Sequence, residues 1–344
     1  MARSTFKVLF YVNGSKEKNG IVPIMGRVTI SQYKVRGSRI LYYGFFVLLP
    51  YKGSNMRAIT PKHIEAYQKG SLKKLFDVIA NDPELSFEIR KDNEVIVYYR
   101  KGKILTIKYT DKNEFQIKPL DKGYYKDVTQ IDLFEPQNLA YTLKNTSYLR
   151  NYFKQAKKLI YNHKVGLEFS VQQNIALGNR SFNNRFLVVD MEWQFSQAEI
   201  KKTERVGRTR IDLIIVDTQV NEFGTNDIYL TELKVGTGAV VGKSGIIDHI
   251  KKTKAIIDKE EVCKDLKNDI ENIIDIKSCL GLIDGERKVL QLSSKPKMMI
   301  ILAYRGKQEK EQLEEQARIA IDEAKKIGMC APLIKSHDLQ ITLK

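Results

Sequence analysis

Three closely spaced strand-like segments constrain the fold of this chain more than any other feature. They are rich in apolar and β-branched residues and cover 185–194, 210–218 and 227–235. A helical pattern over 147–178 precedes them, and we expect Gly166 to divide it into two helices. A helix is expected at 245–259 and a buried strand at 297–304. This order of helix, three strands, helix and strand predicts an α/β fold with a mixed sheet.

The N-terminal part of the chain has a different pattern, with short strands, polar turns and one helix. A helix is expected at 61–79, and hairpin turns are expected at Asp92–Asn93 and at Lys101–Gly102. The expected strands are 6–12, 24–30, 39–50, 85–89, 95–100 and 104–109. Toward the C-terminus we expect helices at 260–277 and 309–327 and a last strand at 338–343.

The length of the chain favours two domains, because 344 residues exceed what one domain usually needs. The pattern changes between 125 and 140. We therefore expect a β-rich α+β domain over 1–130, with possible nucleic-acid binding, and an α/β domain over 131–344.

The charge balance points to an anionic partner. The chain has 58 Lys and Arg against 41 Asp and Glu, a net charge of +17. A basic surface attracts nucleic acids, with an anionic membrane surface as the competing interpretation. No apolar run approaches the roughly 20 residues of a membrane helix, and the N-terminus lacks signal-peptide architecture. Three scattered cysteines give no zinc motif, so we expect a cytoplasmic protein.

The acidic residue Asp212 lies near the start of the second strand-like segment, in a run that otherwise looks buried. An unpaired buried charge is costly, so this carboxylate needs a partner. One interpretation is an ion pair with Arg208 or Arg210. The other is a functional carboxylate, with both arginines as contacts to a nucleic-acid backbone.

The third segment carries Glu232 and Lys234 near its C-terminal end. Side chains alternate along a strand, so these two share a face while Leu233 points to the opposite layer. A salt bridge on a solvated face is one interpretation. The other pairs Glu232 with Asp212 on the neighbouring strand, where two close carboxylates would favour a hard divalent cation, Mg²⁺ or Mn²⁺. Such a cation activates water and polarises phosphoryl oxygens, and Lys234 would assist the attacking water.

These residues and the element order resemble the PD-(D/E)xK nuclease superfamily, over about 160 residues of the chain. The resemblance implies a restriction-endonuclease-like αβββαβ core in which Asp212, Glu232 and the backbone carbonyl of Leu233 bind the metal. It also implies a helical glutamate before the first strand, for which Glu168 is the candidate, with Gln172 on the same helical face. The proline that often precedes the aspartate is replaced here by Ile211.

Two acidic residues of the first segment, Asp190 and Glu192, are expected to share a strand face. They are either auxiliary metal groups or part of an exposed face.

A glycine-rich loop at 236–245 follows the third segment. Its spacing fails for a phosphate-binding Walker loop, because Thr237 stands where a glycine is required. We expect instead that Lys243 contacts a phosphate backbone, aided by the N-terminus of the next helix. Asp248 and His249 are expected to serve helix capping and surface packing.

Residues 1–34 resemble the arm-type DNA-binding domain of Bacteroidetes tyrosine recombinases, in the strands around Phe6 and Ile24. The resemblance implies DNA contact, for which Arg27 is a candidate. The basic and aromatic tract 95–105 is expected to form a hairpin that buries Tyr98 and exposes Arg100.

The leading hypothesis is a Mg²⁺-dependent endonuclease or related phosphodiesterase that acts on DNA, although the sequence does not choose between DNA and RNA. The alternatives are a non-catalytic DNA-binding or recombination accessory protein and, more weakly, a nucleotide-dependent enzyme. The sequence leaves the oligomeric state open, a homodimer included.

Overall fold

The computed structural model describes residues 6–12, 24–30, 56–124, 136–163, 166–195, 209–237 and 245–339. The chain divides into two compact units, Met1–Pro50 and Tyr51–Lys344. In the first unit, β1 (Phe6–Val12) pairs antiparallel with β2 (Ile24–Ile30), which confirms both predicted strands. The strand predicted at 39–50 lies outside the described residues. The predicted domain boundary after residue 130 falls in the undescribed range 125–135 and stays a prediction.

The second unit begins with an antiparallel sheet of order β3-β4-β5-β6. Its strands are β3 (Ser86–Ile89), β4 (Glu94–Tyr99), β5 (Gly102–Tyr109) and β6 (Phe115–Pro119). Two hairpins join the first three of them. The turn predicted at Asp92–Asn93 is confirmed by positive φ angles at both residues. The next turn is centred one residue earlier than predicted, on Arg100 and Lys101, because Tyr99 pairs with Gly102.

The helix predicted over 61–79 is two helices, α1 (Pro61–Gln68) and α2 (Lys73–Ala80). The chain turns at Gly70, where an added Cβ would lie 2.7 Å from the Cα of Ala66. Apolar periodicity continued through this turn because both helices bury their apolar faces against the same sheet.

A second, five-stranded sheet has the order β11-β10-β9-β8-β7. β7 (Phe186–Phe195), β8 (Thr209–Val220) and β9 (Asn226–Val235) are antiparallel neighbours. β10 (Lys297–Tyr304) is parallel to β9, and β11 (Leu333–Asp338) is parallel to β10. The mixed sheet predicted from the sequence is therefore present. The last strand ends at Asp338, where the prediction placed its start, and 340–344 lie outside the described residues.

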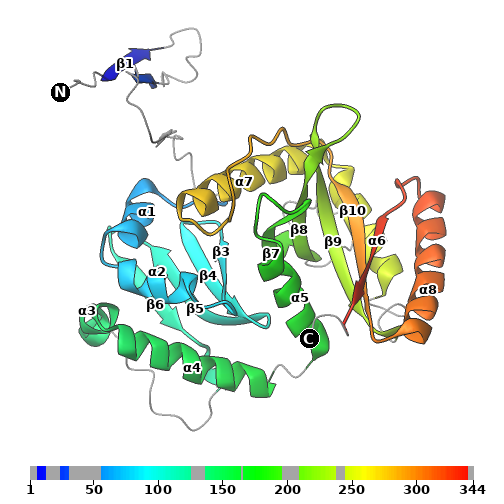
Figure 1. The fold of residues 1–344 in the computed structure, drawn as a ribbon, viewed down its shortest axis with the longest axis horizontal. Helices are drawn as coiled ribbons and strands as arrows, with labels where there is room; N and C mark the ends of the chain where they lie inside the picture. The colour runs from blue at the N-terminus through cyan, green and yellow to red at the C-terminus, as the bar shows by residue number, and fades with distance from the viewer. Residues whose placement is uncertain are drawn as a thin grey trace, which may run out of the picture. The chain divides into compact units, whose positions relative to one another are not determined.

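Helices cover both faces of this sheet (Figure 1). They are α5 (Leu167–Gly178) on one face and α6 (Ile246–Ile257), α7 (Glu260–Cys279) and α8 (Lys307–Lys326) on the other. Helices α3 (Pro136–Lys144) and α4 (Thr146–His163) lie instead beside α2 and the four-stranded sheet. Helices α4 and α5 confirm the predicted division near Gly166. Along β8, Leu213 packs in the core under α5, while its neighbour Ile214 packs in the core that includes α6, α7 and α8. Strand alternation thus places a separate apolar layer on each face.

No helix among the described residues has both the length and the apolar character needed to cross a membrane.

Candidate functional site

Asp212 lies where the strands β8 and β9 stop pairing. The regular pairing runs through Leu213 and Thr231. Beyond that point, Oδ2 of Asp212 accepts the backbone N–H of Leu233 at 2.9 Å. The side chain thus takes the place of a strand carbonyl, which satisfies the buried N–H and holds the carboxylate at the end of the paired region.

The other oxygen of Asp212 contacts an ammonium group from the four-stranded sheet. Nζ of Lys101 lies 3.0 Å from Oδ1 of Asp212, 3.1 Å from Oε1 of Glu168 and 3.4 Å from Oε1 of Glu192. The three carboxylates come from β8, α5 and β7, and the lysine comes from the turn between β4 and β5. We call these four residues the Lys101 cluster. The sequence offered Arg208 and Arg210 as partners of Asp212. Arg208 lies outside the described residues, and Asp212 is paired with Lys101 rather than with Arg210.

Glu192 is the most enclosed carboxylate of the Lys101 cluster. Its oxygens accept hydrogen bonds from Nε2 of Gln172 at 3.0 Å and from Arg210 at 3.0 Å. Its φ angle is 59°, a left-handed conformation that a residue with a Cβ rarely adopts. Such strain persists only where surrounding contacts impose it, and it is common at functional sites.

Glu232 belongs to a neighbouring group that we call the Glu232 cluster. Oε1 of Glu232 lies 2.6 Å from Nζ of Lys234, and Oε2 lies 2.9 Å from Nδ1 of His249 at the start of α6. All three side chains are largely buried. The sequence prediction for His249, helix capping and surface packing, is wrong because the first turn of α6 lies against the end of β9.

The electrostatics couple the two clusters. Burial raises the pKa of Glu232, and the negative charge of Asp212 raises it further, while His249 and Lys234 oppose the shift. For Lys101, burial alone would lower the pKa, but Asp212, Glu192 and Glu168 together outweigh burial and raise it. The carboxylates of Asp212 and Glu232 are thus close enough for one charge to destabilise the other.

The donor types of the Lys101 cluster suit a hard divalent cation. The amide nitrogen of Gln172 faces two acceptors, Glu192 and the backbone carbonyl of Asp212, which leaves its buried Oε1 without a partner. An acceptor of this kind, beside three carboxylates that already hold one cation, is what Mg²⁺ or Mn²⁺ would require. Glu232 and the carbonyl of Leu233 would be further oxygen ligands.

The present spacing of these groups suits an ammonium ion. Within the described part of the chain, no group of three or more His, Cys, Asp or Glu side chains is arranged to hold a metal ion. The N···O distances of 3.0 to 3.4 Å around Lys101 are those of charged hydrogen bonds. Mg²⁺ needs oxygen ligands at about 2.0–2.1 Å.

The structure describes only some of the residues that the sequence predicted to contact nucleic acid. Lys243 and Arg208 lie outside the described residues. Arg27 is on β2, where the backbone alone is described. Arg210 pairs with Glu192 but leaves 57% of its side chain exposed, so it can still reach a ligand.

Asp190 is not part of this site. It is fully buried, and it pairs with Arg57 at 3.3 Å and with Arg90 at 2.8 Å. The interpretation that Asp190 and Glu192 lie on an exposed strand face is therefore wrong, because both side chains are buried. The left-handed backbone at Glu192 interrupts the alternation, so the two carboxylates reach different partners.

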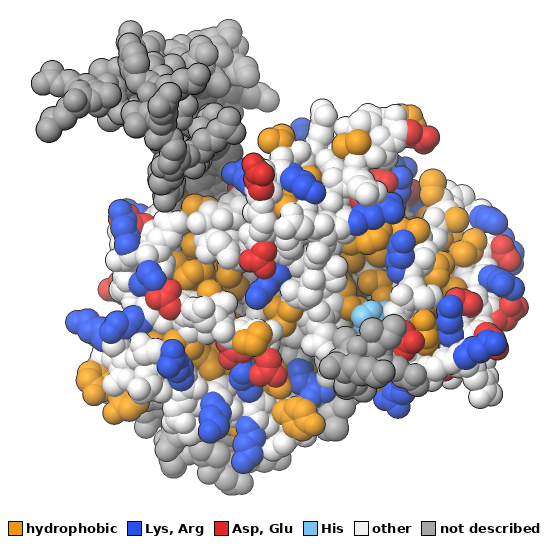
Figure 2. All heavy atoms as spheres, viewed as in Figure 1, with side chains coloured by type: hydrophobic (Ala, Val, Ile, Leu, Met, Phe, Trp, Pro, Cys, Tyr) orange, Lys and Arg blue, Asp and Glu red, His pale blue; other side chains and the backbone are white. Residues whose placement is uncertain are grey.

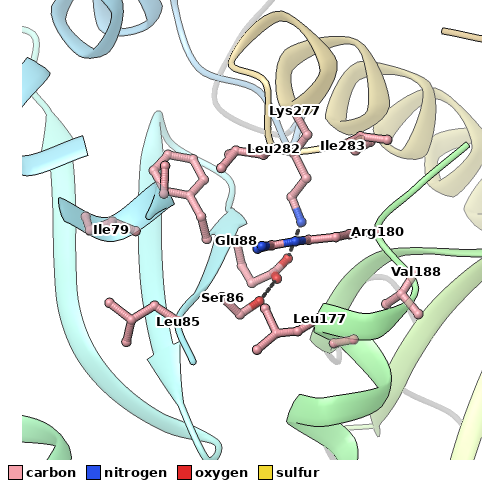
Figure 3. A pocket seen from close by; sticks show the side chains of 13 residues that line it. Ile79, Leu85, Ser86, Glu88, Leu177, Arg180, Val188, Lys277, Leu282 and Ile283 are labelled. Carbon is pink, nitrogen blue, oxygen red and sulfur yellow. Dashed lines mark hydrogen bonds and ion pairs between the residues drawn. The ribbon is translucent and has the colours of Figure 1, made fainter. Parts of the chain in front are cut away.

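Glu88 and Lys277 extend the contacts of Asp190 toward a small cavity. Lys277 and Ser86 both donate to Glu88, the former at 2.8 Å (Figure 3). Lys277 also donates to the carbonyl of Val189 at 2.7 Å. The cavity measures about 30 Å³. Since one water needs some 10–15 Å³, it has room for ordered water and not for a substrate.

For two residues of the site, the sequence analysis did not predict the contact with a site carboxylate. Lys101 is 111 residues from Asp212 in the chain, and nothing in its basic, aromatic segment marks it as a partner of that carboxylate. His249 was assigned to helix capping and surface packing, although a histidine shortly after an E-x-K strand can reach back to the glutamate. The hairpin tract otherwise behaves as predicted for Tyr98, which is buried. Arg100 is only partly exposed, since its guanidinium stacks on Tyr161.

Comparison of the chain with known protein families, with curated proteins and with solved structures finds no match in any of the three.

Proposed function

We propose that this chain is a divalent-metal-dependent nuclease that cleaves DNA, with a restriction-endonuclease-like core. The observation that carries the proposal is the convergence of buried carboxylates from β7, β8 and β9, with the partly exposed Glu168 of α5, at the point where β8 and β9 separate. A phosphodiester is hydrolysed readily at such a site once a hard cation is bound, because the cation polarises a phosphoryl oxygen and acidifies its water.

Asp212, Glu232 and the carbonyl of Leu233 would hold the cation, and Glu192 and Glu168 would supply further carboxylate oxygens to it. Lys234 would act on the attacking water or on the charge that develops on the phosphate, a role supported by the 2.6 Å between its ammonium and Glu232. Glu168 is the most exposed of these carboxylates, with 36% of its side chain accessible, and would contact the solvent side of the substrate.

The charge distribution supports a nucleic-acid substrate. The unit Met1–Pro50 contains eight Lys and Arg residues and one Glu, so it carries a large share of the net charge of +17. On the face of the molecule in Figure 2, acidic and basic side chains of the described surface lie close to one another. We therefore propose that the first unit supplies much of the attraction to the phosphate backbone.

The test is cleavage of supercoiled plasmid, linear duplex and single strands in Mg²⁺, Mn²⁺ or EDTA. Asp212→Asn and Lys234→Ala should each lower the cleavage rate at least about a hundredfold, as removal of one electrostatic catalytic group often does. EDTA should abolish cleavage by the parent protein.

Asp227→Asn is the matched control. Asp227 is on β9, has the same 7% exposure as Asp212, and pairs with Lys297 at 2.7 Å, away from both clusters. Its substitution should leave the cleavage rate within about twofold, because it removes a buried carboxylate outside the site. Parental cleavage rates in both Asp212→Asn and Lys234→Ala would refute the assignment.

A non-catalytic DNA-binding protein is the second candidate. It is favoured by the ammonium of Lys101, which already neutralises part of the carboxylate charge. Such a protein would bind duplex DNA with an affinity that falls steeply with salt and would cut none of the substrates in either metal.

A further inference from the structure

The turn between β4 and β5 places one residue of the four-stranded sheet inside the candidate site. Both central residues of this turn have positive φ, 48° at Arg100 and 60° at Lys101, although neither is a glycine. Glycine and asparagine are the usual residues in such turns. The contacts of the side chains therefore have to hold the backbone in this conformation.

Arg100 anchors the turn to α5. Its backbone N–H donates to Oε1 of Gln173 at 3.0 Å, its guanidinium donates to the hydroxyl of Ser170, and its cation stacks on Tyr161. Gly102 fits closely on the other side, since an added Cβ would lie 2.8 Å from Ile160. With these contacts in place, Lys101 extends into the carboxylates.

The Lys101 cluster keeps an excess of negative charge. Three carboxylates face two cations, the ammonium of Lys101 and the guanidinium of Arg210, and the carboxylate of Glu232 lies in the neighbouring cluster. A divalent cation would neutralise this charge more fully than one ammonium does. Among the described residues, the buried Oε1 of Gln172, whose Nε2 donates to Glu192, has no hydrogen-bond partner.

An ammonium and a metal ion cannot use these oxygens together. The ammonium holds them at 3.0 to 3.4 Å, and ligation of Mg²⁺ at about 2.0–2.1 Å would draw them into the space that Nζ fills. Glu168 is the most exposed member of the cluster, with 36% of its side chain accessible.

We propose that Lys101 is an internal counterion that competes with the divalent cation, so that cation binding requires its ammonium to leave Glu168, Glu192 and Asp212. The proposal rests on the proposed function for the identity of the cation. It assigns the four-stranded sheet a regulatory role in the site, because the turn that carries Lys101 then controls how tightly the cation binds.

The first test uses the parent protein and acetylation of lysines, read by peptide mass spectrometry. Without a divalent cation, Lys101 should react at least about tenfold more slowly than the exposed Lys103, since its side chain is only 9% exposed and its ammonium is held by three carboxylates. Saturating Mg²⁺ should accelerate Lys101 and leave Lys103 unchanged. A rate for Lys101 that does not respond to bound Mg²⁺ would overturn the proposal.

The second test compares Lys101→Met with Lys103→Met by calorimetric titration with Mg²⁺ and Mn²⁺. Lys101→Met should bind each cation at least about fivefold more tightly than the parent, the lower end of ordinary coupling between two ligands. Lys103→Met removes a charge from the same hairpin and should bind as the parent does.

Equal affinity in Lys101→Met and the parent would overturn the competition and leave the nuclease proposal intact. If neither protein binds Mg²⁺ or Mn²⁺, both the competition and the metal-dependent function fail together.

Discussion

The buried charges around Asp190 make a strong prediction about stability. The side chain of Asp190 is fully buried, and its partners Arg57 and Arg90 are only 4% and 11% exposed. Substitution by asparagine keeps the shape and one acceptor oxygen but removes the charge. Two guanidinium groups and the nearby ammonium of Lys277 would then be left with the carboxyl groups of Asp269, beside Arg57, and of Glu88, whose own pKa burial raises to about 7.

The expected cost is large because the remaining cations cannot reach water. Removing one partner of a buried ion pair costs about 3–5 kcal/mol, and the retained acceptor of asparagine places Asp190→Asn near the lower value. With a urea m-value of about 3 kcal/mol per molar for a unit of this size, the midpoint should fall by about 1 M.

Tryptophan fluorescence can follow the unfolding of the region around Asp190. Trp193 is the single tryptophan of the chain, it is 3% exposed, and Arg57 stacks on its ring at 3.7 Å. Urea unfolding followed by tryptophan fluorescence therefore reports on the residues around Asp190.

Asp77→Asn is the control for Asp190→Asn. It removes the exposed pair of Lys73 and Asp77, which lie 2.6 Å apart on α2 with nearly half of each side chain accessible. Exposed pairs contribute less than about 1 kcal/mol, so its midpoint should fall by less than about 0.3 M. Equal midpoints for the two variants would refute the claim that burial gives Asp190 its importance.

Two further predictions concern the four-stranded sheet. Burial lowers the pKa of His63 to about 4, so its contribution to the unfolding free energy is complete above pH 6.5 and is lost as the pH falls toward 4. The stability difference between His63→Phe and the parent should therefore change by up to about 3 kcal/mol across that window in urea titrations, and a constant difference would contradict the low pKa. Gly102→Ala should lower the unfolding free energy by about 1–3 kcal/mol, because its Cβ would meet Ile160 at 2.8 Å, and parental stability would show that the hairpin shifts freely.

The sequence alone indicated four of the five strands of the five-stranded sheet and misplaced the last one, β11. Apolar and β-branched runs marked β7, β8 and β9, and the length and composition of 297–304 marked β10 with the observed bounds. These are local signals, because a strand buried on both faces must be apolar along its length. The same pattern showed that Asp212 and Glu232 interrupt buried runs, which is why both became candidate site residues.

Local signals failed where the chain changes direction. The apolar periodicity of 61–79 continues through Gly70, although the helix ends there. Alternation placed Asp190 and Glu192 on one face, but the left-handed conformation of Glu192 sends them to different partners. A single backbone angle decides such cases, and residue types constrain it weakly.

Only the tertiary structure decided what surrounds the two candidate carboxylates. Lys101 reaches Asp212 across 111 residues of chain, and His249 reaches Glu232 because α6 packs against the end of β9. Electrostatic pairing depends on distance in space, and the packing of two sheets and their helices sets that distance. The sequence could therefore indicate which carboxylates are out of place in their strands, while the fold alone determined which cations they meet.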